Sequence, residues 1–207
     1  WIHGGGNTTG MPSEYNPEIF VKSERIIFVS IAYRLGIFGW LSHPELREQD
    51  GIDSSSNFAL LDQIMALKWV KENIQFFGGN PNNITIFGES AGGQNVIALY
   101  SSPLAKGLFD RAISQSGGTS VTSIKDAEKI NRSDPSYKSS YKNRHVTTEE
   151  WVNILNKKGL IPSKFGEKNN LFDIRSLDSS ALMSGIDKGE FWSSQRDLPR
   201  IISDNVV

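Results

Sequence analysis

Cysteine is absent from the 207 residues of this chain. Disulfides and thiolate metal sites are therefore excluded, and both a cytoplasmic and a secreted location stay open, because secreted bacterial proteins also lack cysteine. Histidine is scarce, with three residues, and no histidine and aspartate cluster has the spacing of a metal site. No Gly-x-Gly-x-x-Gly or P-loop pattern occurs either. We expect neither a metal nor an organic cofactor.

The chain also lacks an excess of charge and a long apolar run. Its 22 basic and 23 acidic residues give a net charge of -1, which provides no electrostatic footprint for nucleic acid or an anionic membrane. No run approaches the roughly 18 apolar residues that span a bilayer. We expect no nucleic-acid partner and no membrane span, and the oligomeric state stays open. The length suits one domain, and no targeting segment can be read at the start.

What the chain does contain is a strand, a sharp turn and a helix start in immediate succession, over residues 77–93. The centre reads Gly-Glu-Ser-Ala-Gly, the G-x-S-x-G pattern of a nucleophile elbow. Glycine is expected at positions 88 and 92, where a side chain would crowd the turn and the neighbouring strand. The pattern alone arises often by chance. The apolar run before it and the helical spacing after it favour a catalytic Ser90 over a glycine-rich turn between core elements.

The first six residues, Trp-Ile-His-Gly-Gly-Gly, form the second informative stretch. They read as the end of a buried strand that runs into a glycine loop. A loop of this type supplies backbone N–H groups to an oxyanion hole, together with the N–H group of the residue after the nucleophile, here Ala91. The alternative is a flexible linker, but a linker would not follow such a strand end.

The rest of the pattern alternates between strands and helices. An apolar run at 25–33 predicts a strand buried on both faces, Gly36 and Gly39 predict a loop, and residues 110–115 predict a further strand. Between them, 57–74 predicts a helix with Ser56 available as N-cap. Its predicted buried stripe comprises Phe58, Leu61, Met65, Ala66, Trp69 and Val70. This alternation predicts an α/β fold, with a doubly wound, mostly parallel sheet and helices on both faces.

Weaker signals complete the pattern. Arg34 and Asp62 are candidates for a buried ion pair between the strand at 25–33 and the helix. Beyond residue 118, the sequence predicts an exposed loop at 131–145, a helix after the Thr147 and Glu150 capping box, a short helix at 179–185 and a strand at 200–207.

Five blocks of the chain resemble, in the same order, blocks of the carboxylesterase and cholinesterase family of α/β hydrolases, also called type B carboxylesterases. The blocks are residues 1–6, 32–42, 57–81, 84–93 and 109–118. The resemblance is close over 1–118 and weaker over 119–207, and residues 77–92 fit the family's serine signature at every constrained position. It implies that residues 1–207 are part of a single α/β-hydrolase catalytic domain.

The resemblance also implies roles for individual residues. Ser90 would be the nucleophile of a serine esterase that cleaves a small carboxylic ester through an acyl-serine intermediate. The oxyanion donors would be Gly5, Gly6 and Ala91, and Glu89 would be an acidic pocket residue beside the serine. No cofactor is implied.

The chain departs from the family pattern in two ways. Asn7 stands where family members often carry an aromatic residue, which concerns the lining of the acyl pocket. Family members are also much longer, and their triad acid and histidine lie downstream of the last residue here. Of the histidines in this chain, we expect His3 to order the glycine loop and His43 to be structural or on the surface, and His145 has no obvious acid before it.

We therefore expect an internal fragment of a longer esterase, nearly inactive on its own because it lacks the triad acid and histidine. The alternative is a non-catalytic, cholinesterase-like adhesion or scaffold module. The intact serine and glycine triplet count against that alternative. A lipase or peptidase on the same fold would share the visible chemistry.

Overall fold

The computed structural model describes residues 1–43, 51–119, 121–128, 148–157, 159, 178–180 and 201–203. The chain forms two compact units. The first unit comprises Trp1–Trp40 and Asn57–Val121 together with Val207, and the second comprises Leu41–Ser56 and Thr122–Val206. The elbow and the glycine loop both belong to the first unit.

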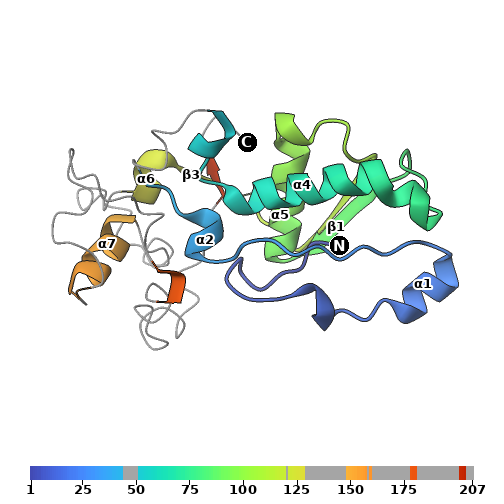
Figure 1. The fold of residues 1–207 in the computed structure, drawn as a ribbon, viewed down its shortest axis with the longest axis horizontal. Helices are drawn as coiled ribbons and strands as arrows, with labels where there is room; N and C mark the ends of the chain where they lie inside the picture. Colours follow the sequence, from blue (N-terminus) through green and yellow to red (C-terminus); the bar gives the residue numbers. More distant parts are fainter. Residues whose placement is uncertain are drawn as a thin grey trace. The chain divides into compact units, whose positions relative to one another are not determined.

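Parallel strands form the centre of the first unit. Strand β1, Thr85–Glu89, pairs in parallel with β2, Arg111–Gln115, and both predicted strands are thereby confirmed. On the other side of β1, Ile2 forms parallel bridges with Gly88 and with Ile31. The N-terminus accordingly lies beside β1 (Figure 1). Four parallel segments therefore lie in the order 31, 2, 88, 114.

This order places a topological switch point between Ile2 and β1. The chain passes from Ile2 outward to Ile31 and then returns to the other side of Ile2 to form β1. In open parallel sheets, ligands bind outside the carboxyl ends of the strands at such a point. The glycine loop follows the Ile2 segment and Ser90 follows β1, so both predicted site segments start at this place.

The apolar run at 25–33 pairs only in part. The Ile31 N–H donates to the Trp1 carbonyl at 3.2 Å, and the terminal nitrogen of Trp1 donates to the Val29 carbonyl at 2.6 Å. Ile26 and Ile27 are exposed, because they precede the point where this pairing begins. The prediction of a strand buried on both faces is therefore wrong for the start of the run.

Helix α4, Phe58–Asn73, confirms the predicted helix but not its details. The N-cap position is Asn57 and not Ser56, and it makes no side-chain capping bond. Met65 and Trp69, predicted to be buried, are exposed. The buried residues are Ala59, Leu60, Gln63, Ile64, Leu67 and Val70. Apolar residues lie around most of this helix, so their spacing did not single out the face that packs.

Helix α5, Ala91–Ser101, follows the elbow and packs on β1 and β2 (Figure 1). Shorter helices of this unit are η1 (Pro12–Glu14), α1 (Glu18–Glu24), α2 (Ile37–Trp40), η3 (Ile74–Phe77) and η4 (Pro103–Ala105). The α2 turn replaces part of the predicted glycine loop. A Cβ atom at Gly39 would lie 2.9 Å from the Ala59 methyl group, so α2 packs directly against α4.

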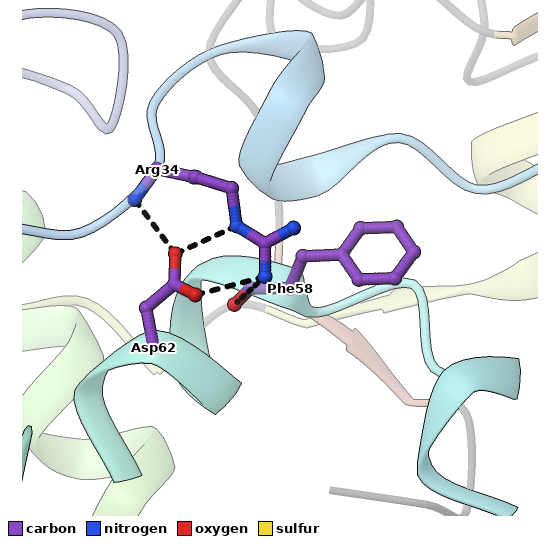
Figure 2. A network of polar contacts seen from close by, with 3 residues as sticks. All are labelled: Arg34, Phe58 and Asp62. Atoms are coloured by element: carbon purple, nitrogen blue, oxygen red, sulfur yellow. Dashed lines mark hydrogen bonds and ion pairs between the residues drawn. The ribbon is translucent and has the colours of Figure 1, made fainter. Parts of the chain in front are cut away.

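The predicted ion pair between Arg34 and Asp62 is present, as Figure 2 shows. Arg34 Nη2 and Nε donate to the two carboxylate oxygens of Asp62, each at 2.8 Å, and the backbone N–H of Arg34 donates to Oδ2 at 2.9 Å. The guanidinium carbon lies 5.2 Å from the centre of the Phe58 ring. The side chains are 49% and 27% exposed, so the prediction that the pair is buried is wrong.

The second unit is described in shorter pieces. Its elements are η2 (Gly51–Ser54), β3 (Thr122–Ser123), α6 (Ile124–Glu128), α7 (Thr148–Lys157) and β4 (Ile202–Ser203). Strands β3 and β4 pair in parallel. Ser42 donates to the buried Glu128 carboxylate at 2.8 Å and accepts from Ser56 at 3.0 Å, while Thr148 donates to the Ser42 carbonyl. A buried polar cluster therefore organises this unit.

Four weaker predictions concern the second unit. Helix α7 confirms a helix after the capping box, although Thr147 itself lies outside the described residues, as do residues 131–145. Strand β4 confirms an extended segment within 200–207. Of the predicted helix at 179–185, only the first two residues are described, and both are helical. None of the described helices combines the length and the apolar character needed to cross a membrane.

Candidate active site

Ser90 occupies a strained backbone conformation between β1 and α5. Its φ is 56° and its ψ is -119°, and positive φ is rare and costly outside glycine. Its N–H donates to the Gln115 carbonyl at 2.8 Å, which continues the pairing with β2 one residue past β1. Ser90 is the N-cap residue of α5, yet its side chain makes no capping hydrogen bond. The exposed hydroxyl is thereby left available, unlike that of an ordinary N-cap serine.

Gly88 and Gly92 allow close backbone contacts, as the sequence predicted. A Cβ atom at Gly92 would lie 2.0 Å from the Ile2 carbonyl oxygen and 2.7 Å from that of His3. At Gly88 it would lie 2.6 Å from the carbonyl group of Gly92. Neither glycine has a positive φ, so close approach and not dihedral freedom is the reason for glycine here. The start of α5 therefore sits directly against the N-terminal segment.

A second glycine contact, which the sequence analysis missed, lies on the β2 side of the elbow. A Cβ atom at Gly93 would lie 2.6 Å from the Gln115 carbonyl oxygen and 3.1 Å from Gly117 Cα. Ser114 also donates to the Gly93 carbonyl at 2.9 Å. The glycine pair after residue 116 is the sequence signal for this contact.

The glycine loop begins beside Ser90. A Cβ atom at Gly4 would lie 3.4 Å from Ser90 Cβ and 2.8 Å from the Glu89 carbonyl oxygen. The next two glycines, Gly5 and Gly6, have φ values of 96° and 64°. The Gly5 carbonyl accepts from the N–H groups of Thr8 and Thr9, at 3.1 and 3.0 Å. The loop is therefore a tight left-handed turn and not a linker.

The N–H groups of Gly5, Gly6 and Ala91, the residues predicted as oxyanion donors, have no acceptor in the part of the chain that the structure describes. The Ser90 N–H, in contrast, is bound to Gln115. Because Ala91 is the first residue of α5, its N–H has no partner inside the helix.

Buried contacts fix the start of the glycine loop. His3 Nδ1 lies 2.8 Å from the Gly4 carbonyl oxygen, and since a carbonyl only accepts, Nδ1 carries the proton. The His3 ring stacks on Tyr33, with ring centres 4.5 Å apart, and the Tyr33 hydroxyl donates to the His3 carbonyl at 2.6 Å. Burial raises the pKa of Tyr33, Tyr15 raises it further, and a contact with the Asn95 side chain opposes the rise. His3 therefore orders the loop, as the sequence predicted.

Asn7 ends the loop and faces α5. It has a φ of 60° and is 1% exposed. Its side-chain amide exchanges two hydrogen bonds with that of Asn95, a fully buried residue of α5. The sequence linked Asn7 only to the lining of the acyl pocket and did not identify Asn95 as its partner. Its signal was a polar residue within the otherwise apolar run 95–100.

Glu89, the predicted acidic pocket residue, is exposed and lies next to the loop. Its Oε2 atom would be 3.2 Å from a Cβ atom at Gly4. Glu89 Oε2 and Ser90 Cβ thus both lie close to Gly4 at the carboxyl end of β1.

The described residues contain no partner for the Ser90 hydroxyl. His3 is held by the loop, and His145 lies outside the described part. His43, in the second unit, is buried, so a surface position is wrong and a structural one fits. Within that same part of the chain, no three His, Cys, Asp or Glu residues are grouped as a metal site requires.

The model of the family described as "Carboxylesterase family" matches residues 1–189. This chain belongs to the carboxylesterase family. Among curated relatives, carboxylesterase 1D of Rattus norvegicus is 51% identical over 117 residues, which is 56% of this chain and 20% of the relative. Liver carboxylesterase 1 of Oryctolagus cuniculus is 48% identical over 124 residues, or 60% of this chain and 21% of the relative. The match thus spans about a fifth of each relative's length.

Comparison with solved structures identifies the fold of this carboxylesterase-family chain. The carboxylesterase EST55 of Geobacillus stearothermophilus at pH 6.8 matches with a TM-score of 0.70 and 34% identity, over 99% of this chain and 38% of that protein. A PNB esterase matches with a TM-score of 0.69 and 30% identity, over 100% of this chain and 37% of that protein. The chain carries part of an α/β-hydrolase fold, as predicted.

Proposed function

We propose that the complete protein is a serine hydrolase that cleaves carboxylic esters through an acyl-serine on Ser90. The observation that carries this proposal is the conformation of Ser90, which has a positive φ at the end of β1. Its side chain makes no capping hydrogen bond, is exposed and lies next to Gly4. Carboxylesterase-family membership supports it. In this proposal, residues 1–207 form part of one catalytic domain.

The chemistry proceeds in two steps. The Ser90 oxygen attacks the ester carbonyl carbon, its proton passes to a general base, and a tetrahedral oxyanion forms. The N–H groups of Gly5, Gly6 and Ala91 bind this oxyanion, for which donors must lie about 3 Å from the charged oxygen. The alcohol then leaves with a proton and an acyl-serine remains. Water attacks the acyl carbon, releases the acid and restores the Ser90 hydroxyl.

The general base and its acidic partner belong, in this proposal, to a part of the complete protein outside these 207 residues. Two observations support this assignment. The match spans about a fifth of the curated relatives, and His3, the histidine nearest in sequence to the glycine loop, is committed to the Gly4 carbonyl and to Tyr33.

Glu89 is the acidic residue of the proposed pocket. Its carboxylate is exposed and lies near Gly4, the first glycine of the loop. A negative charge at this point disfavours anionic substrates by like-charge repulsion and leaves neutral esters as the preferred class.

Hydrolysis of a 4-nitrophenyl ester by the complete protein tests the proposal. We expect Ser90→Ala to lower the rate by about 10³-fold or more, since the nucleophile is lost. Ser101→Ala, at the exposed far end of α5, is the control and is expected to retain activity. A complete protein with no hydrolysis, or one that Ser90→Ala leaves unchanged, would contradict the proposal and favour the non-catalytic adhesion or scaffold module.

A panel of substrates separates the related reactions. Short-chain esters should be turned over faster than long-chain esters or amides if the protein is a carboxylesterase. A preference for long acyl chains would indicate a lipase, and a preference for amides would indicate a peptidase.

A further inference from the structure

Two buried asparagines join the glycine loop to the helix that follows the serine. Asn95 Nδ2 donates to Asn7 Oδ1 at 2.9 Å, and Asn7 Nδ2 donates to Asn95 Oδ1 at 3.4 Å. The residues are 88 positions apart in the chain and are 1% and 0% exposed. A buried amide that loses its partner has no water to replace it, so the Asn7 side chain depends on Asn95, which also contacts Tyr33.

Each asparagine sits next to proposed oxyanion donors. Asn7 directly follows Gly6, and its carbonyl accepts from the Gly36 N–H at 2.7 Å, which fixes its peptide group. Asn95 lies one helical turn after Ala91 on α5. A shift between the two side chains is therefore a shift between the loop donors and the helix donor.

The Asn7 and Asn95 pair supports a part of the glycine loop that the other buried contacts do not reach. The start of the loop is held by the Tyr33 hydroxyl on the His3 carbonyl and by His3 on the Gly4 carbonyl. Those contacts come before Gly5. The Asn7 and Asn95 bridge holds the loop after Gly6, where the backbone is left-handed and has no strand or helix to support it.

We propose that Asn7 and Asn95 are positioning residues that hold the N–H groups of Gly5 and Gly6 in register with that of Ala91. This inference rests on the proposed function of Ser90. The proposed role should affect kcat and not KM. Donors aimed at an oxyanion stabilise the transition state more than the bound ester, so the pair sets kcat and leaves KM nearly unchanged.

The test compares variants of the complete protein in ester hydrolysis. Asn95→Ala removes one amide, and Asn7→Gly removes the other without strain, because glycine accepts a φ of 60°. Each is expected to lower kcat by about 10- to 100-fold, less than the roughly 10²- to 10³-fold cost of losing a donor outright. The double variant should be about as slow as Asn95→Ala alone, because both substitutions remove the same bridge and only Asn95→Ala also removes the contact with Tyr33.

A transition-state analogue gives a readout that lower stability alone would not move. A trifluoromethyl ketone forms a tetrahedral adduct with an active-site serine, and its inhibition constant should rise in parallel with the loss in kcat/KM. Leu99→Ala, at a fully buried position one turn further along α5, is the destabilised control. It should lower the melting temperature and leave kcat and the inhibition constant unchanged.

The outcomes separate this inference from the proposed function. If the unmodified protein is inactive, the proposed function fails. If it is active and Ser90→Ala is not, but Asn95→Ala and Asn7→Gly keep kcat within about twofold, only the positioning role is overturned. A rise in KM without a fall in kcat, or a double variant slowed by the product of the two single effects, would overturn it as well.

Discussion

Gly92 determines how closely α5 approaches the N-terminal segment. Alanine is normally preferred to glycine in a helix, by about 1 kcal/mol. Here the Cβ atom of an alanine would lie 2.0 Å from the Ile2 carbonyl oxygen, so the substitution should destabilise the fold instead of stabilising it. We expect Gly92→Ala to lower the free energy of unfolding by about 3 kcal/mol or more, at or beyond the upper end for overpacking. Thermal or urea unfolding of the complete protein measures it.

Gly118 provides the matched control for that substitution. A Cβ atom there would meet nothing within 4 Å, and its φ is not positive. Gly118→Ala is therefore expected to change the stability by no more than about 0.5 kcal/mol. If both variants are equally stable, the close contact between α5 and Ile2 is absent in solution.

Tyr33 makes the stability of the first unit sensitive to high pH. Burial raises its pKa above the ordinary value of 10.0, so the folded protein keeps the phenolic proton while the unfolded chain loses it. The folded state therefore binds more protons above about pH 10, and stability falls there as pH rises, by up to about 1.4 kcal/mol per pH unit. Urea unfolding between pH 9 and 11 measures this slope.

Tyr33→Phe isolates that contribution. The variant loses the hydrogen bond to the His3 carbonyl at all pH values, but the other tyrosines titrate in both proteins. Its slope above pH 10 should be smaller than that of the unmodified protein. Equal slopes would show that Tyr33 does not remain protonated in its buried position.

At the level of single residues, the sequence predicted the positions that depend on steric rules. Gly88 and Gly92 were assigned to close approach, and both contacts are present. Asn95 could not be singled out because its hydrogen-bond partner, Asn7, lies 88 residues away in the sequence. No local pattern brings Asn7 and Asn95 together, since only the parallel pairing of the Ile2 segment with β1 places them side by side.

At the level of elements, Arg34 and Asp62 connect the segment after Ile31 to α4. The contact is bidentate and includes the Arg34 backbone, but both side chains are partly exposed. We expect a double-mutant cycle of Arg34→Ala and Asp62→Ala to give a coupling energy of about 1 kcal/mol that shrinks in high salt. Arg34→Lys should recover only part of it, because lysine cannot make the paired contact.

The exposed pair Lys22 and Glu18 on α1 is the control for this cycle. Its side chains are 75% and 60% exposed, and its single contact measures 2.6 Å. Such a pair should show less coupling than Arg34 and Asp62. Equal coupling energies would mean that the bidentate geometry adds nothing.

Whether a helix or strand exists was easier to predict than which of its faces is buried. Residues 84–87 are a short apolar run between turn residues, and residues 110–115 were predicted as the next strand of the alternation; both segments form strands. In α4, apolar side chains lie on several sides, so the face that packs depends on neighbours such as Gly39. The start of the 25–33 run was predicted to be buried, but its burial depends on pairing that begins only at Val29.

At the level of the whole molecule, we assign the general base to a part of the protein outside these residues. Expressed alone, residues 1–207 should hydrolyse esters at least about 10³-fold more slowly than the complete protein, since a triad member is missing. Initial rates at equal concentration, with circular dichroism to confirm folding, measure the ratio. A piece within tenfold of the complete protein would place the base inside these residues.

The most direct test of the central claim is to locate the residue that becomes acylated. The complete protein is treated with a fluorophosphonate, which reacts with activated serines, and its peptides are analysed by mass spectrometry. The account predicts one adduct per chain, on Ser90, with none formed on the Ser90→Ala variant. An adduct on another residue, or no adduct in a protein that hydrolyses esters, would contradict it.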